Sequence, residues 1–368
     1  MNSPKSPSCE GPIKHLAILG RGIAGLTAAY HLSKAGFKPV IFGRKQAGAQ
    51  ASRAAQGVLC NKGLIFFESP LFKAKLESLR SMPAFLDRIE SESGQPIPRL
   101  FQGVNEPFWT EDDFQKTVSR IYRGKFWGAH RTQIQTPPKS TNNPLGYIHY
   151  PDDGWFDPRA FLDALEHILK REGILFIEED VETFQTIDTK IEINKQSFDQ
   201  IILATGAGSA NLWPELDCKA LRMFLIGGQT LECERQMVGD EAIQVKGNQS
   251  IAILKDKVIM GSTSWPGFES ADIKADADQL RDAIQTNFGQ TFTGGLSRSG
   301  TRMRFKDRMP LVGWLNTGKH AGKIYFLTGF YKNGMHLAEI CAREMLCDIT
   351  NKGDERSYPE FSALRFSV

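Results

Sequence analysis

The sequence predicts an α/β fold that combines a Rossmann-like βαβ unit with a second part built on a mixed or antiparallel sheet. Three observations lead to this prediction. A glycine-rich turn, GxGxxG, joins a short apolar strand to a helix within residues 15–35. Two later apolar strands, beginning at 201 and 323, end in small residues. The segments 225–234 and 251–263 alternate or run apolar with short turns, which is typical of antiparallel strands.

The composition is that of an ordinary soluble globular protein. The 368 residues include 45 Lys+Arg and 42 Asp+Glu, for a net charge of +3, with 41% hydrophobic and 24% charged residues. These fractions exclude the disordered, collagen-like and low-complexity classes. The near-zero net charge gives no reason to propose a polyanionic partner, although a local basic patch would not show in the sum. At roughly 150 residues per domain, the length predicts about two domains.

Targeting segments, disulfides and metals are not expected. No run of about 18 apolar residues occurs, so we expect no membrane span. Residues 1–14 are rich in Pro and Ser and lack the apolar stretch of a signal peptide, so we expect a disordered tail and a cytoplasmic protein. The six cysteines are scattered, and the seven histidines do not pair at ligand spacing. We therefore expect reduced thiols and no metal site.

The first strand, turn and helix form the most informative unit. An apolar run, His15–Leu19, is followed at once by the GxGxxG turn, residues 20–25. A helix is expected over Leu26–Ala35, and a second apolar strand over Val40–Phe42. A βαβ unit of this length with the glycines in this place predicts dinucleotide binding, with a ligand-free glycine turn as the alternative. The pattern alone does not separate NAD from FAD.

Each glycine of the turn has a physical role. Gly20 permits the tight turn, Gly22 lets the backbone approach a pyrophosphate, and Gly25 lets the helix pack close to the sheet. The free N–H groups of the helix N-terminus then face the phosphates. An acidic ribose ligand is expected at the end of the second strand, but Gly43 and Arg44 stand there. Either a backbone group or water replaces the carboxylate, or Arg44 contacts a phosphate.

Further elements follow from local patterns. Apolar spacing predicts a helix over Pro70–Glu92 with a break at Pro83, and the pattern over 94–150 is irregular. Asp157 is the expected N-cap of a helix that ends at Gly173. The strand within Ile201–Gly208 runs into small residues, so its end can approach a bound cofactor. Helices are also expected over 275–288 and 335–349.

With these elements in this order, the chain resembles the FAD-dependent D-amino-acid-oxidase superfamily, which includes glycine oxidases and sarcosine-type amine oxidases. The matching segments appear in family order, at residues 18–32, 51–59, 153–165, 201–208, 227–230, 258–263, 301–313 and 327–335. The resemblance implies a discontinuous FAD-binding domain and a substrate or cap domain. The first would comprise 15–75, 150–220 and 299–368, and the second 76–149 and 221–298.

The resemblance also implies where FAD binds. The expected cofactor residues are Gly20, Gly22, Ile23, Ala24, Gly25, Arg44, Ala51, Ser52, Val181, Thr205, Gly206, Gly329, Lys332, Asn333, Gly334 and Met335. The reduced flavin is anionic near N1 and C2=O, and backbone N–H groups of Asn333 and Gly334 at a helix N-terminus favour that charge. No histidine occurs in 51–57 and no cysteine lies between Arg302 and Gly334, so we expect non-covalent FAD.

Two residues are expected to act on the substrate. The family places a carboxylate-binding arginine in a G-x-R-P stretch, and Gly300-Thr301-Arg302 matches it with Met303 in place of the proline. Arg302 is therefore expected to be a bidentate carboxylate clamp, with a surface salt bridge as the alternative. Lys332 replaces an arginine sometimes found in the C-terminal turn. Its charge would serve oxygen activation, or it is a solvated turn lysine. Aromatic pocket walls are expected at Trp155, Phe224, Trp265, Phe330 and Tyr331.

The implied activity is oxidation of the C–N bond of a small amine or amino acid, by hydride transfer to flavin N5 with oxygen as acceptor. Three alternatives stay open. The chain could be a dehydrogenase with a different acceptor, or a non-catalytic flavoprotein. It is also similar to the FAD domain of the bifunctional enzyme that demodifies carboxymethylaminomethyl-uridine in tRNA, through Ala51, Ser52, Gln56 and Gly57. The sequence does not indicate the amine or the oligomeric state.

Overall fold

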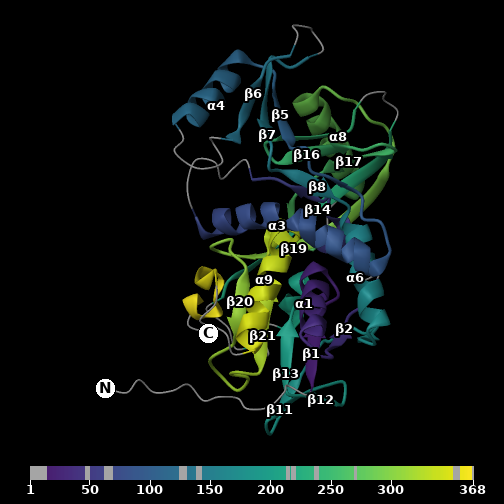
Figure 1. The fold of residues 1–368 in the computed structure, drawn as a ribbon, viewed down its shortest axis with the longest axis vertical. Coiled ribbons are helices and arrows are strands. Elements are labelled where there is room, and N and C mark those ends of the chain that lie inside the picture. The colour runs from purple at the N-terminus through teal and green to yellow at the C-terminus, as the bar shows by residue number, and fades with distance from the viewer. Residues whose placement is uncertain are drawn as a thin grey trace.

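The computed structural model describes residues 15–45, 50–61, 69–123, 131–137, 143–212, 216, 221–235, 240–268, 272–350 and 357–366. The tail expected over residues 1–14 lies outside these ranges. The molecule is elongated, with one sheet and its helices at each end of the long axis (Figure 1). In the described part of the chain, no helix is both long and apolar enough to cross a membrane.

One end of the molecule is built on a six-stranded sheet. Its strand order is β20 (Leu311–Trp314), β21 (Ile324–Thr328), β13 (Gln200–Leu203), β1 (Leu16–Leu19), β2 (Val40–Phe42) and β9 (Leu175–Ile177). All neighbours are parallel except β20 and β21. Ile18 at the centre pairs with Ile202 and Ile41, and all three side chains are fully buried. The Rossmann-like part of the predicted fold is thus confirmed.

Four helices pack beside this sheet, and the first and last of them in the sequence contact its strands. They are α1 (Ile23–Lys34), α3 (Pro70–Ser93), α6 (Pro158–Arg171) and α9 (Gly334–Ile349), and they pack against one another. The break expected at Pro83 is wrong, because α3 continues through it. Proline removes one backbone hydrogen bond, but most helical stability comes from packing of the apolar face. Phe85 and Leu86, two and three residues after the proline, are buried in the core.

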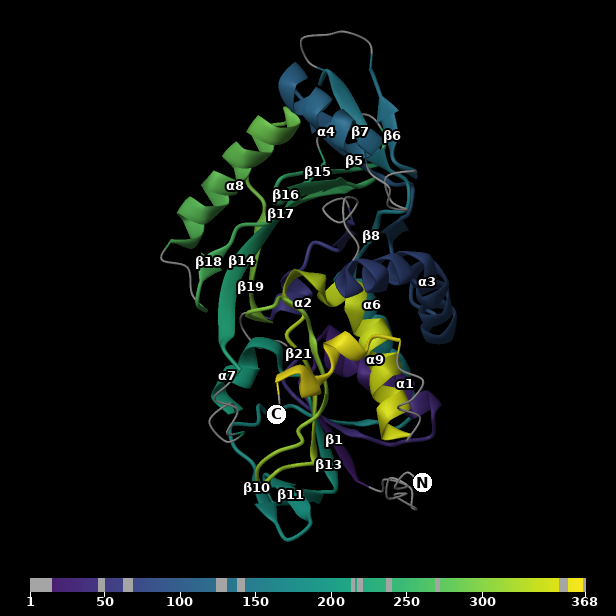
Figure 2. The same ribbon diagram turned by 90° about the vertical axis from the view of Figure 1, so that its left-hand side faces the viewer.

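The other end of the molecule is built on a nine-stranded mixed sheet. Its order is β18 (Trp265–Pro266), β14 (Met223–Glu234), β17 (Lys257–Gly261), β16 (Gln249–Ile253), β15 (Ala242–Lys246), β5 (Val104–Phe108), β7 (Gly146–Tyr150) and β6 (Gln133–Gln135), with β19 (Leu296–Phe305) paired to β14. Only β15 and β5 are parallel. Helices α8 (Ile273–Phe288) and α4 (Glu111–Arg123) accompany this sheet (Figure 2). The mixed second sheet was predicted, whereas α4, β5 and β7 lie in the stretch interpreted as irregular.

Long strands and small elements connect the two ends. The antiparallel pair β14 and β19 runs from the second sheet toward the first (Figure 2). The boundary expected at residue 299 falls within β19, and the division into domains by residue stays a prediction. The remaining elements are α2 (Ala51–Ala54), α7 (Ser209–Leu212), a sheet of β3 (Val58–Leu59), β8 (Gly154–Phe156) and β4 (Arg99–Leu100), and a sheet of β10 (Gln185–Ile187), β11 (Lys190–Ile193) and β12 (Gln196–Phe198).

Candidate functional site

A cavity of about 820 Å³ lies between the carboxyl ends of the parallel strands and the second sheet. This is the edge at which open α/β sheets bind their ligands. Each predicted cofactor residue except Gly25 lines the cavity, and so does Arg302. Segments far apart in the sequence therefore meet here as the resemblance implies, while the role of each residue toward a cofactor stays a prediction.

The glycine turn shapes one wall of the cavity. Gly20 has φ of +115°, which L side chains rarely adopt, and a Cβ there would lie 2.6 Å from the Ala204 carbonyl carbon. A Cβ on Gly25 would run into the Gly20 backbone, at 3.0 Å from its carbonyl carbon and closer still to its oxygen. Gly25 thus lies behind the turn and lets α1 approach the sheet, which explains why it does not line the cavity.

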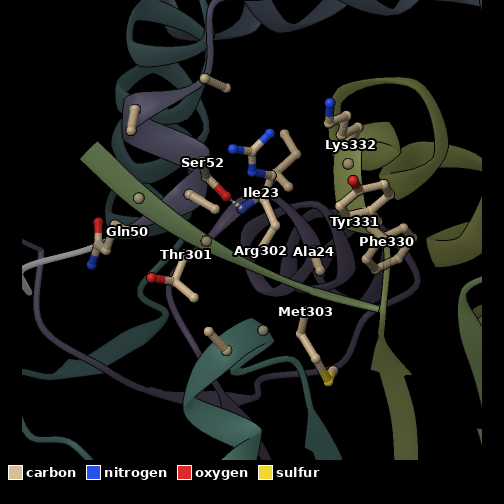
Figure 3. A pocket seen from close by; sticks show the side chains of 18 of the residues that line it. Ile23, Ala24, Gln50, Ser52, Thr301, Arg302, Met303, Phe330, Tyr331 and Lys332 are labelled. Atoms are coloured by element: carbon tan, nitrogen blue, oxygen red, sulfur yellow. Dashed lines mark hydrogen bonds between the residues drawn. The ribbon is translucent and has the colours of Figure 1, made fainter. Parts of the chain in front are cut away.

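The N-terminus of α1 opens into the cavity beside Ser52. Gly22 is the N-cap residue of α1 and supplies no side-chain cap. Ser52, from α2, provides one instead: its Oγ accepts a hydrogen bond from the Ile23 backbone N–H at 3.0 Å (Figure 3). A Cβ on Gly22 would lie 3.0 Å from the same Oγ. The turn therefore offers backbone N–H groups to an anion and has no room for a larger residue.

Gly43 follows β2, at the position where an acidic ribose ligand was expected, and Arg21 crowds this position. Gly43 has φ of +144°, and a Cβ there would lie 3.2 Å from Arg21 Cβ. The buried Arg21 guanidinium donates to Glu166 at 3.0 and 2.8 Å and also to Glu178. Arg21 fills the space next to Gly43, so a side chain at position 43 would have little room.

The acidic residues of the cavity lining come from the segment after β9. Asp180 and Glu182 line it on either side of Val181, and Asp180 pairs with Arg44 at 3.4 Å. No other carboxylate lines the cavity among the residues that the structure describes. The lining is therefore acidic near Val181 and free of carboxylates toward Arg302.

Arg302 lies on β19 near the middle of the cavity (Figure 3). Its Nη2 donates to the backbone carbonyls of Gly227 at 3.0 Å and Thr263 at 3.1 Å. Burial lowers the pKa of Arg302, and no carboxylate of the described residues acts on it. Arg302 therefore forms no surface salt bridge with a described carboxylate, which was the alternative expectation. The guanidinium is held by two carbonyls and its remaining N–H groups are available to a ligand.

Lys332 lies in the turn between β21 and α9, at residues 331–333. It lines the cavity but is exposed at its rim, with its ammonium 5.7 Å from the Tyr331 ring centroid. The surrounding protein lowers the pKa of Lys332, and the charges of Arg302 and Arg308 lower it further. Its exposure fits the alternative of a solvated lysine, and its neighbours give the rim of the cavity a cationic character.

Two of the five expected aromatic walls line the cavity. Phe330 and Tyr331 do so, whereas Trp155 is buried in the core with its Nε1–H bonded to the Gln56 carbonyl at 2.7 Å. Phe224 lies outside the lining under the Arg304 guanidinium, and Trp265 packs against Gly227. A single aromatic residue in a strand carries too little signal to distinguish the cavity from the core.

Several lining residues were not predicted. Gln56, between α2 and β3, ties this segment to the second sheet, because its Nε2 donates to the carbonyls of Ser250 at 3.0 Å and Ile259 at 2.7 Å. Phe268, shortly after β18, also lines the cavity, and Lys75 and His336 line it from α3 and α9. Lys75 had a detectable signal, because it stands three residues after Phe72 and four before Leu79, on the apolar face of its helix.

Comparison with known proteins agrees with this arrangement. The family model described as FAD dependent oxidoreductase, DAO, matches residues 15–347. The glycine oxidase of Geobacillus kaustophilus (strain HTA426) is 21% identical over 383 residues, covering 96% of each chain.

Solved structures share the fold. The glycine oxidase structure from Geobacillus kaustophilus superposes with a TM-score of 0.80 at 20% identity, covering 94% of this chain and 97% of the other. The iminodiacetate oxidase from Chelativorans sp. BNC1 also has a TM-score of 0.80, at 16% identity, covering 94% of this chain and 98% of the other.

Proposed function

Because the chain belongs to the family of FAD-dependent oxidoreductases, we propose that it oxidises the C–N bond of a small amine that carries a carboxylate. The known relatives include a glycine oxidase and an iminodiacetate oxidase, both acting on substrates of this chemical kind. The observation that carries the proposal is Arg302, a half-buried guanidinium that lines the cavity with no carboxylate partner in the described chain.

The cavity fits FAD. The crowded glycine turn and the N-terminus of α1 form a cradle for the diphosphate at Gly20 and Gly22. Ala51 and Ser52 would approach the middle of the cofactor, and Val181 would hold its adenine side. The remaining contacts would come from Thr205 and Gly206 and from the turn after β21, where Gly329, Lys332, Asn333, Gly334 and Met335 would flank the flavin pyrimidine. When bound, FAD supplies the two-electron acceptor for the substrate hydride.

The protein's own residues bind and orient the amine. Arg302 would bind the substrate carboxylate through the N–H groups that its two backbone contacts leave available. Lys332 adds a second positive charge nearby. Positive charges disfavour a bound ammonium, so Arg302 and Lys332 lower the pKa of the substrate amine and favour its neutral form. Only the neutral amine has the nitrogen lone pair that assists loss of the hydride.

We propose oxygen as the electron acceptor and a non-covalent cofactor in a cytoplasmic protein. The charge of Lys332 would favour oxygen reduction at the rim of the cavity. A quinone or protein acceptor, and a carboxymethylaminomethyl group carried by tRNA, are the other outcomes that the following experiment distinguishes.

The experiment is an anaerobic titration of the FAD-loaded protein with a panel of carboxylated primary and secondary amines, followed by visible absorption. Bleaching of the flavin spectrum by these amines, but not by amines without a carboxylate, is the expected result. If no small amine bleaches the flavin, the proposal is wrong, and tRNA bearing the modified uridine is tested next. Stopped-flow mixing of the bleached protein with oxygen or a quinone then identifies the acceptor.

A further inference from the structure

We infer that the cavity contains a second anion subsite, formed by Lys75 and His336, and that the substrate amine carries a second anionic group besides the one bound by Arg302. The inference rests on the proposed function and narrows its substrate class to dicarboxylated amines. It depends on two buried side chains that neither the fold nor the cofactor cradle requires.

Lys75 is a buried cation that lines the cavity. It lies on α3 with 9% of its surface exposed, and its only hydrogen bond in the described chain goes to the Cys60 carbonyl at 2.7 Å. An ammonium has three N–H donors, so two remain available. A buried amine on the apolar face of a helix is costly unless it is paired, which points to a partner that arrives with a ligand.

His336 lines the same cavity from the first turn of α9. It is 3% exposed, and neither its Nδ1 nor its Nε2 makes a hydrogen bond of normal geometry to any described residue. Buried polar groups in folded proteins nearly always have a partner. The Cys60 carbonyl is the one described acceptor near the ring, so at least one ring nitrogen at the cavity surface indicates a missing ligand or solvent molecule. A neutral imidazole can donate one hydrogen bond to an anion.

The two side chains are close enough to influence each other. Burial lowers the pKa of His336 well below its usual value and the charge of Lys75 lowers it further, while the Cys60 backbone carbonyl, as an acceptor for a ring N–H, acts to raise it. The helices that carry them, α3 and α9, pack against each other, and α3 also packs against α6 (Figure 2). His336 is therefore neutral at physiological pH, and the charge of the subsite is that of Lys75.

One buried carboxylate outside the cavity lining balances part of the charge of Lys75. Asp153 is buried and does not line the cavity, and its Oδ2 accepts the Asn61 backbone N–H at 2.9 Å. Burial lowers the pKa of Lys75, whereas Cys60 and Asp153 act to raise it. Asp153 thus helps Lys75 to keep its proton, while the side that faces the cavity has no carboxylate among the described residues.

The subsite is electrostatically distinct from Arg302. The cations that act on Lys332 are Arg302 and Arg308, and the groups that act on Lys75 are Cys60 and Asp153. Arg302 and Lys332 belong to β19 and the turn before α9, whereas Lys75 comes from α3. Lys75 acts on His336, which follows the turn that carries Lys332, so both cationic groups belong to the part of the cavity beside that turn. An amine with one carboxylate satisfies one group, and an amine with two satisfies both.

The test compares ligands that differ only in the second carboxylate. Propionate and succinate are titrated into the FAD-loaded protein, and binding is read from the perturbed flavin spectrum, with no turnover required. Succinate is expected to bind at least about tenfold more tightly, as one additional charge-assisted contact predicts. Lys75→Met and His336→Leu should each reduce this ratio toward one. Lys73→Met, at an exposed position on the same helix, is the matched control and should leave the ratio unchanged.

Oxidation is measured separately with glycine against iminodiacetate and D-alanine against D-aspartate. If succinate binds no more tightly than propionate to the wild-type protein, the second subsite is wrong, whatever the variants do. It is also wrong if Lys75→Met preserves the ratio and slows only the reaction of the bleached protein with oxygen. If the ratio depends on Lys75 but no amine bleaches the flavin, the subsite stands and the proposed oxidation fails.

Discussion

Gly228 leaves the space that the Arg302 side chain occupies. Substitution of Gly228 therefore tests the proposed carboxylate clamp while Arg302 itself is kept. A Cβ at position 228 would lie 2.6 Å from the Thr263 carbonyl oxygen, 2.8 Å from Arg302 Cζ and closer still to Arg302 Nη2. These distances are shorter than any real Cβ contact. The Gly228→Ala variant must therefore displace the guanidinium from its two backbone carbonyls.

The size of the effect follows from the hydrogen bonds that a displaced guanidinium no longer makes to the substrate. A bidentate guanidinium–carboxylate pair comprises two charge-assisted hydrogen bonds of about 1.5 kcal/mol each. Removing both costs about 3 kcal/mol, which is roughly 100-fold in affinity. We expect Gly228→Ala to raise the KM for a carboxylated amine by roughly that factor, and Arg302→Ala to do the same. The double variant should be no worse than Arg302→Ala alone, because both changes remove one interaction.

The assay is steady-state oxidation with the FAD content and melting temperature of each variant measured in parallel. Arg304→Ala is the control, since Arg304 lies two residues along β19, outside the cavity lining and over the Phe224 ring at 4.4 Å. An unchanged KM in a Gly228→Ala protein that retains FAD would refute the clamp. So would additive effects in the double variant.

Three other predictions concern the cofactor cradle and the buried acid. Gly22→Val should abolish FAD retention, read from the ratio of flavin to protein absorbance, because its side chain would fill the approach to the α1 N-terminus beside Ser52; retained FAD would contradict this. Ser52→Ala should lower the free energy of unfolding by about 1 kcal/mol in urea, because it removes the cap on Ile23; an unchanged free energy would show that the cap contributes nothing. Burial raises the pKa of Asp153 to about 6, so the folded state binds the extra proton and stability falls as pH rises from about 4 to about 6. Asp153→Asn should remove up to about 3 kcal/mol of that decrease between about pH 4 and about pH 6, whereas an unaltered pH dependence would show that Asp153 is not the group.

The parallel sheet and its helices could be predicted because their signals are local. β1, β2 and β13 are short apolar runs beside glycines, and Asp157 caps α6 as expected, accepting from the Arg159 N–H at 2.9 Å. In contrast, β5 contains Pro107 and two polar residues within five positions. It becomes a strand through pairing with β7 and β15, which are distant in the sequence.

The site could be predicted only where residues belong to a motif. Arg302 and the turn after β21 follow from the resemblance, but Lys75 and His336 do not. Their burial depends on α3 packing against α9, about 260 positions later in the chain. The crowding of position 43 by Arg21 was equally hidden, since Arg21 takes its conformation from Glu166 and Glu178.

Small-amine oxidation in this cavity is tested most simply by the anaerobic titration of the FAD-loaded protein with glycine, iminodiacetate and an amine lacking a carboxylate. We predict that the carboxylated amines bleach the flavin spectrum, iminodiacetate at the lowest concentration, and that the amine without a carboxylate does not. A flavin spectrum that none of these amines changes would contradict the assignment of the cavity as a site of small-amine oxidation.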